Sequence, residues 1–256
     1  MSKYKNKALH GQFETATERV RDPESWGWLK RKILKKETEG LLTAAQDQAL
    51  RTNSIKNRID KEDVSPMCRL CGEREETVSH IVAECKKLAQ REYKMWRHDK
   101  VGQVIHWKLC QKFNIPCKDK WYDHDPEGVI ENDQVKVLWD FRIQTDHQIE
   151  HNRPDVVVLD KIERSCYVID IACPFDTRVL EKEQEKMEKY QELKREIGKI
   201  WSYRKVIVVP IVIGALGTFS KYLKTSLKKI GLDCTVLLQK ASLLGTARIL
   251  RRTLDT

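Results

Sequence analysis

The sequence contains no apolar run long enough to cross a membrane. Its longest run, Val206 to Leu216, is interrupted by Pro210 and Gly214, whereas a membrane-spanning helix needs about 20 apolar residues. The N-terminus is basic and no apolar stretch follows it, so a secretory signal peptide is not expected. Internal repeats and low-complexity segments are absent as well. We therefore expect an intracellular protein without a membrane partner.

Disulfide bonds are not expected, although the chain has eight cysteines. The cysteines cluster, whereas those of a small secreted domain are spread in pairs along the chain. Three of them fall between residues 68 and 85. This distribution favours free or metal-bound thiols in a reducing compartment.

Acidic residues are scarce after residue 200. Overall, the chain contains 48 Lys and Arg residues and 38 Asp and Glu residues, which gives a net charge of +10. Residues 1–100 carry 22 basic and 16 acidic groups, residues 101–200 carry 16 and 20, and residues 201–256 carry 10 and 2. This basic–acidic–basic pattern suits a protein that binds a polyanion and holds carboxylates for a metal in its middle. Charge alone is equally compatible with a solvated surface that has no partner.

The chain is long enough to bury one sizeable core, with or without a small satellite domain. Of its 256 residues 40% are hydrophobic and 34% are charged, and the apolar residues recur along the whole length. Disorder is therefore excluded. Helical spacing of apolar residues predicts helices within residues 1–60 and one long helix over 80–113, followed by a connecting loop over 114–134.

Beyond this loop the apolar period changes to two, which is typical of strands. We expect strands over 136–144, 155–159 and 166–172, the last two joined as a hairpin by a turn at 161–164. A helix over 178–201, a fully apolar strand over 205–213 and two further helices follow. The expected fold class is α/β, with the order α-β-β-β-α-β.

A zinc site is predicted from the spacing of Cys68, Cys71, His80 and Cys85. Two thiolates two residues apart can bind one metal from a tight turn, and a His and a Cys on the next helix complete a tetrahedron. Four protein ligands leave no open position, so the site would be structural. The alternative is a set of free buried thiols beside an unrelated histidine. The other five cysteines have no metal-like spacing and are interpreted as core or surface residues.

A second constellation consists of two aspartates on the predicted hairpin. Asp155 follows Pro154, and Asp170 lies on the paired strand, so both carboxylates should reach one end of the sheet. Two converging carboxylates are what a hard divalent cation such as Mg²⁺ needs. Taken alone, this pattern is no more specific than surface aspartates at strand ends.

With these motifs in order, the chain resembles the restriction-like endonuclease of early-branching non-LTR retrotransposons, a branch of the PD-(D/E)XK nuclease superfamily. The match covers roughly residues 60–215. The Cys/His knuckle is followed by Arg97-His98-Asp99, Arg153-Pro154-Asp155, Ile169-Asp170-Ile171 and Lys186-x-x-Lys189-Tyr190-x-x-Leu193.

The resemblance implies a restriction-endonuclease-like core at 95–256, preceded by a helical region at 1–60 and a CCHC zinc knuckle at 61–94. It implies a metal-dependent DNA endonuclease that nicks target DNA to prime reverse transcription. Such an enzyme would act in the nucleus when its target is chromosomal DNA. Catalysis would use Mg²⁺ or Mn²⁺, with Zn²⁺ structural. The implied Mg²⁺ ligands are Asp155 and Asp170, the catalytic lysines are Lys186 and Lys189, and the DNA-binding residues are Arg97, His98, Asp99 and Arg153.

The chain departs from the superfamily in two respects. The usual lysine two residues after the second acid is replaced by Ala172, with lysines on the following helix, as in the retrotransposon branch. A polymerase motif of the Tyr-x-Asp-Asp type is absent, so no polymerase activity is expected; the partners would be DNA, element RNA and a reverse transcriptase supplied elsewhere. The alternatives are a catalytically decayed nucleic-acid-binding remnant and a cellular zinc-containing regulator.

Helical geometry favours Lys186 over Lys189 as the acting lysine. On the helix 178–201, an apolar stripe through Tyr190 should face the sheet, with Lys186 about 40° and Lys189 about 100° from Tyr190. A lysine on this stripe costs desolvation unless it meets an anion, which Asp155, Asp170 and a substrate phosphate would supply. The alternative is that Lys186 extends its ammonium along the stripe into water.

Overall fold

The protein is organised around one mixed five-stranded sheet, seen in a computed structural model that describes residues 10–254. The remaining residues of the predicted 1–60 and 95–256 regions lie outside the described part. The strands, in sheet order, are β1 (Val129–Glu131), β2 (Val135–Trp139), β3 (Val156–Asp160), β4 (Ser165–Ala172) and β5 (Lys205–Val212). The expected α/β class is confirmed.

Strand pairing follows the predicted connections. The first four strands pair antiparallel, and the β3–β4 hairpin closes at Asp160 and Ser165, as expected for a turn over 161–164. β5 runs parallel to β4 over its whole length. A parallel pair needs a crossover connection, which helices α7 (Val179–Lys189) and α8 (Gln191–Ile200) provide.

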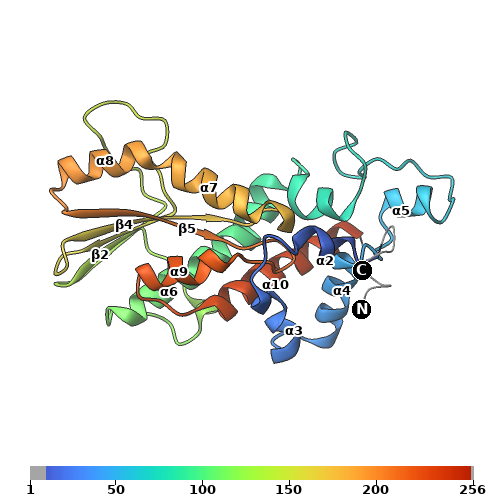
Figure 1. The fold of residues 1–256 in the computed structure, drawn as a ribbon, viewed down its shortest axis with the longest axis horizontal. Coiled ribbons are helices and arrows are strands. Elements are labelled where there is room, and N and C mark those ends of the chain that lie inside the picture. The colour runs from blue at the N-terminus through green and yellow to red at the C-terminus, as the bar shows by residue number, and fades with distance from the viewer. Residues whose placement is uncertain (1–9, 255–256) are drawn as a thin grey trace.

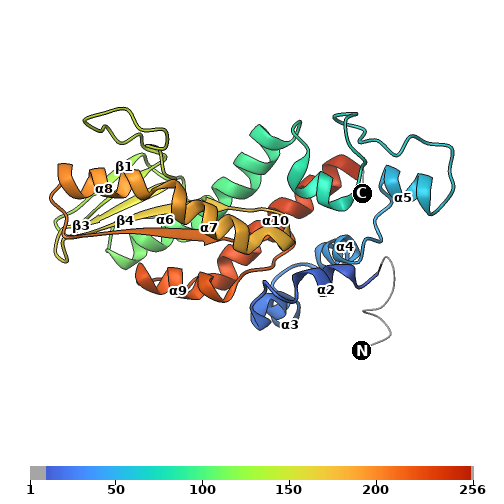
Figure 2. The same cartoon turned by 45° about the horizontal axis from the view of Figure 1, so that its top comes forward.

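Helices cover both faces of the sheet (Figures 1 and 2). α7 and α8 lie on one face, where Leu193 and Ile197 pack against Val168 in one apolar cluster. On the other face, α6 (Asp99–Lys112), α9 (Lys221–Lys229) and α10 (Thr235–Leu254) pack against β2 to β5. The strands therefore bury both of their faces, which explains their nearly continuous valine and isoleucine content.

The N-terminal region is helical, as predicted. Its helices are η1 (Pro23–Trp26), α2 (Gln12–Thr17), α3 (Gly27–Arg31), α4 (Lys36–Gln46) and α5 (Asn53–Arg58). A second apolar cluster joins Trp28 and Leu42 of this region to Ile81 of the predicted knuckle and Leu243 of α10. The three predicted parts of the chain thus share buried surface.

The strand predicted over 136–144 was too long. Asp140 adopts a left-handed φ of 46°, which ends β2 at Trp139. Residues 141–153 form a loop, although Ile143 and Ile149 keep their side chains buried. The alternating pattern continued past the strand because these side chains pack under the loop. The predicted loop 114–134, in turn, contains the short edge strand β1 and the 3₁₀ helix η4 (Trp121–Asp123).

Both long predicted helices are interrupted. In place of one helix over 80–113 there are two π-helices, η2 (His80–Glu84) and η3 (Ala89–His98), followed by α6. The first break falls at Cys85, whose backbone is extended. The helix predicted over 178–201 breaks at Tyr190, between α7 and α8. Within residues 10–254, no helix combines the length and apolar character that a bilayer crossing requires.

Candidate active site and metal centre

The two predicted carboxylates lie on the same face of neighbouring strands. Val156 pairs with Ile169, so Asp155, which directly precedes β3, is next to the position of Asp170 on β4. Side chains alternate between the two faces along β4, so Asp170 points away from the face of Ile169 and toward α7 and α8, where it is 2% exposed. The hairpin register thus brings the two side chains to the same end of the sheet.

Asp170 is surrounded by cationic and hydroxyl groups from the α7–α8 junction. Lys186 Nζ lies 2.5 Å from Asp170 Oδ2, and Lys189 Nζ lies 3.6 Å from Oδ1. The hydroxyl of Tyr190 donates to Asp170 Oδ1 at 2.6 Å. Burial alone would lower the pKa of Lys186, but the negative charge of Asp170 outweighs it and raises this pKa. The break at Tyr190 lets one residue both end α7 and reach the carboxylate.

Asp155 is held from the other side by backbone and by His98. The N–H of Ile171 donates to Asp155 Oδ2 at 2.6 Å, and His98 Nε2 lies 3.2 Å from the same oxygen. His98 Nδ1 lies 2.9 Å from Asp99 Oδ1. Burial lowers the pKa of His98, but its contacts with Asp155 and Asp99 outweigh burial and raise the pKa to about 10. The two carboxylates therefore favour the protonated form of His98.

The carboxylate pair fits a divalent cation by the chemistry of its donors. The described contacts of Asp155 all fall on Oδ2, which leaves Oδ1 to face a cation. Asp170 Oδ2 is fully buried against the ammonium of Lys186, whose positive charge balances it. Two anionic oxygens at one end of the sheet are the hard ligands that Mg²⁺ or Mn²⁺ takes, with water and phosphate in the remaining positions.

A cavity of about 360 Å³ opens beside this site. Asp155 and His98 form one side of it, and Tyr93, Lys94 and Cys173 contribute to the rest. Lys94 is exposed and lines the same cavity as Asp155, so a positive charge borders the space beside this carboxylate. The cavity is large enough for part of a nucleotide.

Among the predicted DNA-binding residues, Arg97 is the one whose side chain is buried. It is 1% exposed, and its guanidinium donates to the carbonyl oxygens of Val82 and Cys173 and to the hydroxyl of Thr246. Its guanidinium is therefore occupied by internal acceptors in this structure, and a contact with DNA stays a prediction. Arg97 instead ties the knuckle, α10 and the end of β4 together, because its length and five donors suit three separate acceptors.

Arg153 and Asp99 keep positions compatible with the prediction. The side chain of Arg153 is 53% exposed and pairs with Asp140 Oδ2 at 2.8 Å. Its carbonyl accepts from Tyr190, so it directly borders the Asp170 environment. Asp99 is half-buried and orients His98. DNA contact by Arg153 and by Asp99 stays a prediction.

The four predicted zinc ligands converge in one place. The ligand atoms of Cys68, Cys71, His80 and Cys85 all lie within 4.8 Å of one another. Cys68 Sγ and Cys85 Sγ are 3.9 Å apart, and Cys71 Sγ and His80 Nε2 are 3.4 Å apart. A zinc tetrahedron with ordinary bond lengths has S–S and S–N edges of about 3.8 Å and 3.5 Å. The group can therefore hold a metal such as zinc.

The surroundings shift the pKa values of two of these thiols in opposite directions and fix the turn that carries Cys85. Backbone N–H groups of Glu73 and Arg74 lower the pKa of the Cys71 thiol, and burial raises that of Cys85 to about 11. The hydroxyl of Tyr93 accepts from the N–H of Cys85 and donates to the carbonyl of Ile81, which fixes the turn between η2 and η3. The extended backbone at Cys85 directs its thiol back toward the other ligands.

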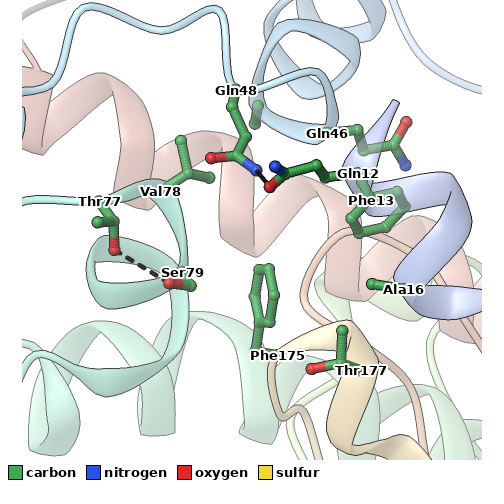
Figure 3. A pocket seen from close by; sticks show the side chains of 11 residues that line it. Gln12, Phe13, Ala16, Gln46, Gln48, Thr77, Val78, Ser79, Phe175 and Thr177 are labelled. Atoms are coloured by element: carbon green, nitrogen blue, oxygen red, sulfur yellow. Dashed lines mark hydrogen bonds between the residues drawn. The ribbon is translucent and has the colours of Figure 1, made fainter. Parts of the chain in front are cut away.

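Figure 3 shows another hollow, of about 230 Å³, where the N-terminal helices meet residues 77–79 and 175–177. Phe175 stands between Phe13 and Ser79 in this view. The lining consists of apolar, amide and hydroxyl side chains and includes no carboxylate, imidazole, thiol or cationic group. It offers no general base and no anionic metal ligand.

Sequence reasoning missed one group. His106, Cys110 and His124 also form a cluster that could hold a metal. The available signal was a His and a Cys four residues apart on a helix, which places both on one helical face. The partner His124 lies on the predicted loop, so its approach could not be derived from spacing.

No protein-family model matches the chain, and no curated protein matches it either. Any functional conclusion therefore depends on the geometry of these sites.

Proposed function

We propose that the protein is a metal-dependent DNA endonuclease that hydrolyses a phosphodiester bond, with the fold and branch of the restriction-like nucleases described above. One observation carries the proposal: two carboxylates, Asp155 and Asp170, and one buried lysine, Lys186, meet at one end of a sheet. The elements that bring them there occur in the order α6, β2, β3, β4, α7–α8, β5. Apart from the short edge strand β1, which precedes β2, this order is compatible with the α-β-β-β-α-β arrangement that the resemblance implies.

Each residue has a distinct task in this proposal. Asp155 and Asp170 hold the catalytic Mg²⁺ or Mn²⁺, which when bound polarises the scissile phosphate and lowers the pKa of an attacking water. Lys186 stabilises the negative charge that develops on the phosphate. His98 is a positioning residue, because its two nitrogens face Asp155 and Asp99 and fix the first carboxylate. Zn²⁺ at the knuckle is structural.

Nicking of supercoiled plasmid DNA tests the proposal directly. We expect relaxation to the open circle with Mg²⁺ or Mn²⁺ and none with EDTA. Asp170→Asn should lose at least 10²-fold in rate, since it removes the charge but keeps an acceptor for Tyr190. Asp160→Asn is the matched control, because Asp160 lies at the opposite end of the same hairpin.

Two outcomes would contradict the assignment. Asp170→Asn protein that nicks at the wild-type rate would remove this carboxylate from the chemistry. Wild-type protein that binds DNA but leaves it intact with every divalent metal tried would favour the decayed nucleic-acid-binding remnant. Adding a reverse transcriptase from a related element would then test whether the chain acts only as a partner.

A further inference from the structure

Three metal-ligating side chains gather away from both sites described above. His106 and Cys110 lie one turn apart on α6, and His124 directly follows η4 in the segment that packs on this helix. Their ligand atoms all lie within 4.8 Å of one another. The three residues are between 1% and 6% exposed. The cluster is therefore internal, and water reaches it poorly.

The geometry is close to that of a metal centre but is held by hydrogen bonds. Cys110 Sγ lies 3.6 Å from His106 Nδ1, which matches the S–N edge of about 3.5 Å in a zinc tetrahedron. His106 Nδ1 and His124 Nε2 are 2.7 Å apart, a hydrogen-bond distance, whereas a zinc N–N edge is about 3.3 Å. Separation of the two rings by about 0.6 Å would convert one arrangement into the other.

The ring of His106 has few other constraints. Its Nε2 is buried, and apart from an interaction of the ring with the Glu127 backbone it has no partner among the described residues. The orientation of the ring therefore depends on its Nδ1 contacts and on the edge-on packing of Trp139, whose ring centroid is 5.9 Å away. The Nδ1 contacts are the ones that a metal would replace.

We propose that His106, Cys110 and His124 bind a second Zn²⁺, distinct from the knuckle. Two imidazoles and one thiolate are ligands that zinc prefers, and hard cations such as Mg²⁺ disfavour this set. The fourth position is open to the half-buried thiol of Cys117, which lies on the same segment, or to water.

Such a metal would add a link between two parts of the chain that already meet where the Trp107 indole donates to the Lys118 carbonyl at 2.7 Å. It would attach the segment around His124 to α6, where the side chain of Gln103 already donates to the His124 carbonyl. α6 begins directly after His98, and Trp139 at the end of β2 packs against His106. The second zinc would therefore stiffen the helix and strand ends that lead to the carboxylate site.

Zinc stoichiometry tests this proposal without an activity assay. Protein purified without chelator should contain two Zn²⁺ per chain by elemental analysis. Cys110→Ser should contain one, and Cys71→Ser should also lose one, from the knuckle. Cys234→Ser is the matched control, because Cys234 is an equally buried thiol on the same side of the sheet with no clustered histidine, and it should keep two.

A wild-type protein with a single zinc that Cys71→Ser removes would overturn the proposal, and so would a Cys110→Ser protein that retains two. His124→Gln offers a second variant if Cys110→Ser fails to fold. It should retain the wild-type circular dichroism spectrum and lose one zinc. Wild-type stoichiometry needs no variant, so the proposal stays decidable in every case.

Discussion

At the scale of single residues, Asp170 is the centre of the candidate site. A carboxylate buried this deeply is stable only with close compensation, and Lys186, Lys189 and Tyr190 supply it from one helix junction. The type and spacing of these residues were visible in the sequence. The burial of each side chain was not visible in the sequence. Arg97 was therefore predicted to contact DNA, because arginine suits a phosphate, although its side chain is buried in the protein.

The two lysines should differ in their effect on catalysis. Lys186 is the closer to Asp170, at 2.5 Å against 3.6 Å, and the less exposed, at 16% against 26%. We expect Lys186→Ala to lower the nicking rate by about 10²–10³-fold with folding intact, and Lys189→Ala to lower it less. Single-turnover nicking measures both. A dead Lys189→Ala beside an active Lys186→Ala would exchange the two roles, and normal rates in both would exclude the helix lysines.

A buried carboxylate outside the site gives a pH-dependent prediction. Glu183 on α7 is 6% exposed; burial raises its pKa, although the hydroxyl of Ser220 donates to it at 2.6 Å. An acid with a raised folded pKa contributes stability below its unfolded value of about 4.3, and this contribution is lost as the pH rises through the folded pKa. Glu183→Gln should therefore raise the Tm at pH 8 by a few degrees and leave it unchanged at pH 4.

Thermal unfolding of Glu183→Gln at the two pH values is the measurement. Glu181→Gln serves as the control, since Glu181 is exposed on the same helix and should show little change. A lower Tm for Glu183→Gln at pH 8 would mean that the ionised carboxylate is stabilised by groups other than Ser220.

At the scale of elements, period and spacing predicted which segments form strands and helices better than where they end. The hairpin 161–164 and strand β5 follow from local pattern alone. The breaks at Cys85 and Tyr190 do not, because they depend on side chains that meet partners far along the chain: a ligand cluster for Cys85 and Asp170 for Tyr190. Edge strand β1 has only three residues and was hidden by its polar neighbours.

Close contact between α10 and η3 gives a prediction about helix packing. A Cβ on Gly245 would lie 2.6 Å from the carbonyl oxygen of Trp96, a backbone atom that cannot swing away. Gly245→Ala should lower the free energy of unfolding by about 2 kcal/mol, despite the better helix propensity of alanine. Gly40→Ala on α4 meets nothing within 4 Å and should raise it by about 0.5–1 kcal/mol. Denaturant titration measures the free energy of unfolding of both variants. Equal changes in the two would contradict the close approach of Gly245 to the Trp96 carbonyl oxygen.

Metal removal should act first on the knuckle. Zinc binding by Cys68, Cys71, His80 and Cys85 is local folding energy, so EDTA or Cys71→Ser should expose residues 66–88 to hydrogen exchange. The shared cluster with Leu243 predicts that part of α10 loses protection too, whereas β3 and β4 keep theirs. Exchange mass spectrometry measures this. Full protection of 66–88 in metal-free protein would show that the ligands fold without zinc.

At the scale of the whole molecule, the net charge of +10 is not all available to a polyanion. In the basic segment 201–256, Arg248 and Arg252 face Glu92, and Lys224 faces Asp22 and Glu24. Composition counted these charges but could not show which of them are paired. Arg91 and Lys94 on η3 are exposed, and Lys94 borders the cavity beside Asp155. We therefore expect DNA to approach the carboxylates across η3.

DNA affinity as a function of salt tests this path. If Arg91 and Lys94 each contact a phosphate, the double alanine variant should weaken binding of any DNA sequence and flatten the slope of log affinity against log salt by about 2. The control is the double variant Lys199→Ala/Lys205→Ala, in which both lysines are exposed and lie far from the site. Lys205 pairs with Ser165, which lies five residues, or about 16 Å, along β4 from Asp170. Lys199 lies near the end of α8. That variant should bind as wild type does. Asp170→Asn should also keep full affinity while losing cleavage, because phosphate contacts position the DNA and the carboxylates act on it. An equal loss in both double variants would mean that binding follows net charge alone and that η3 does not guide DNA to the site.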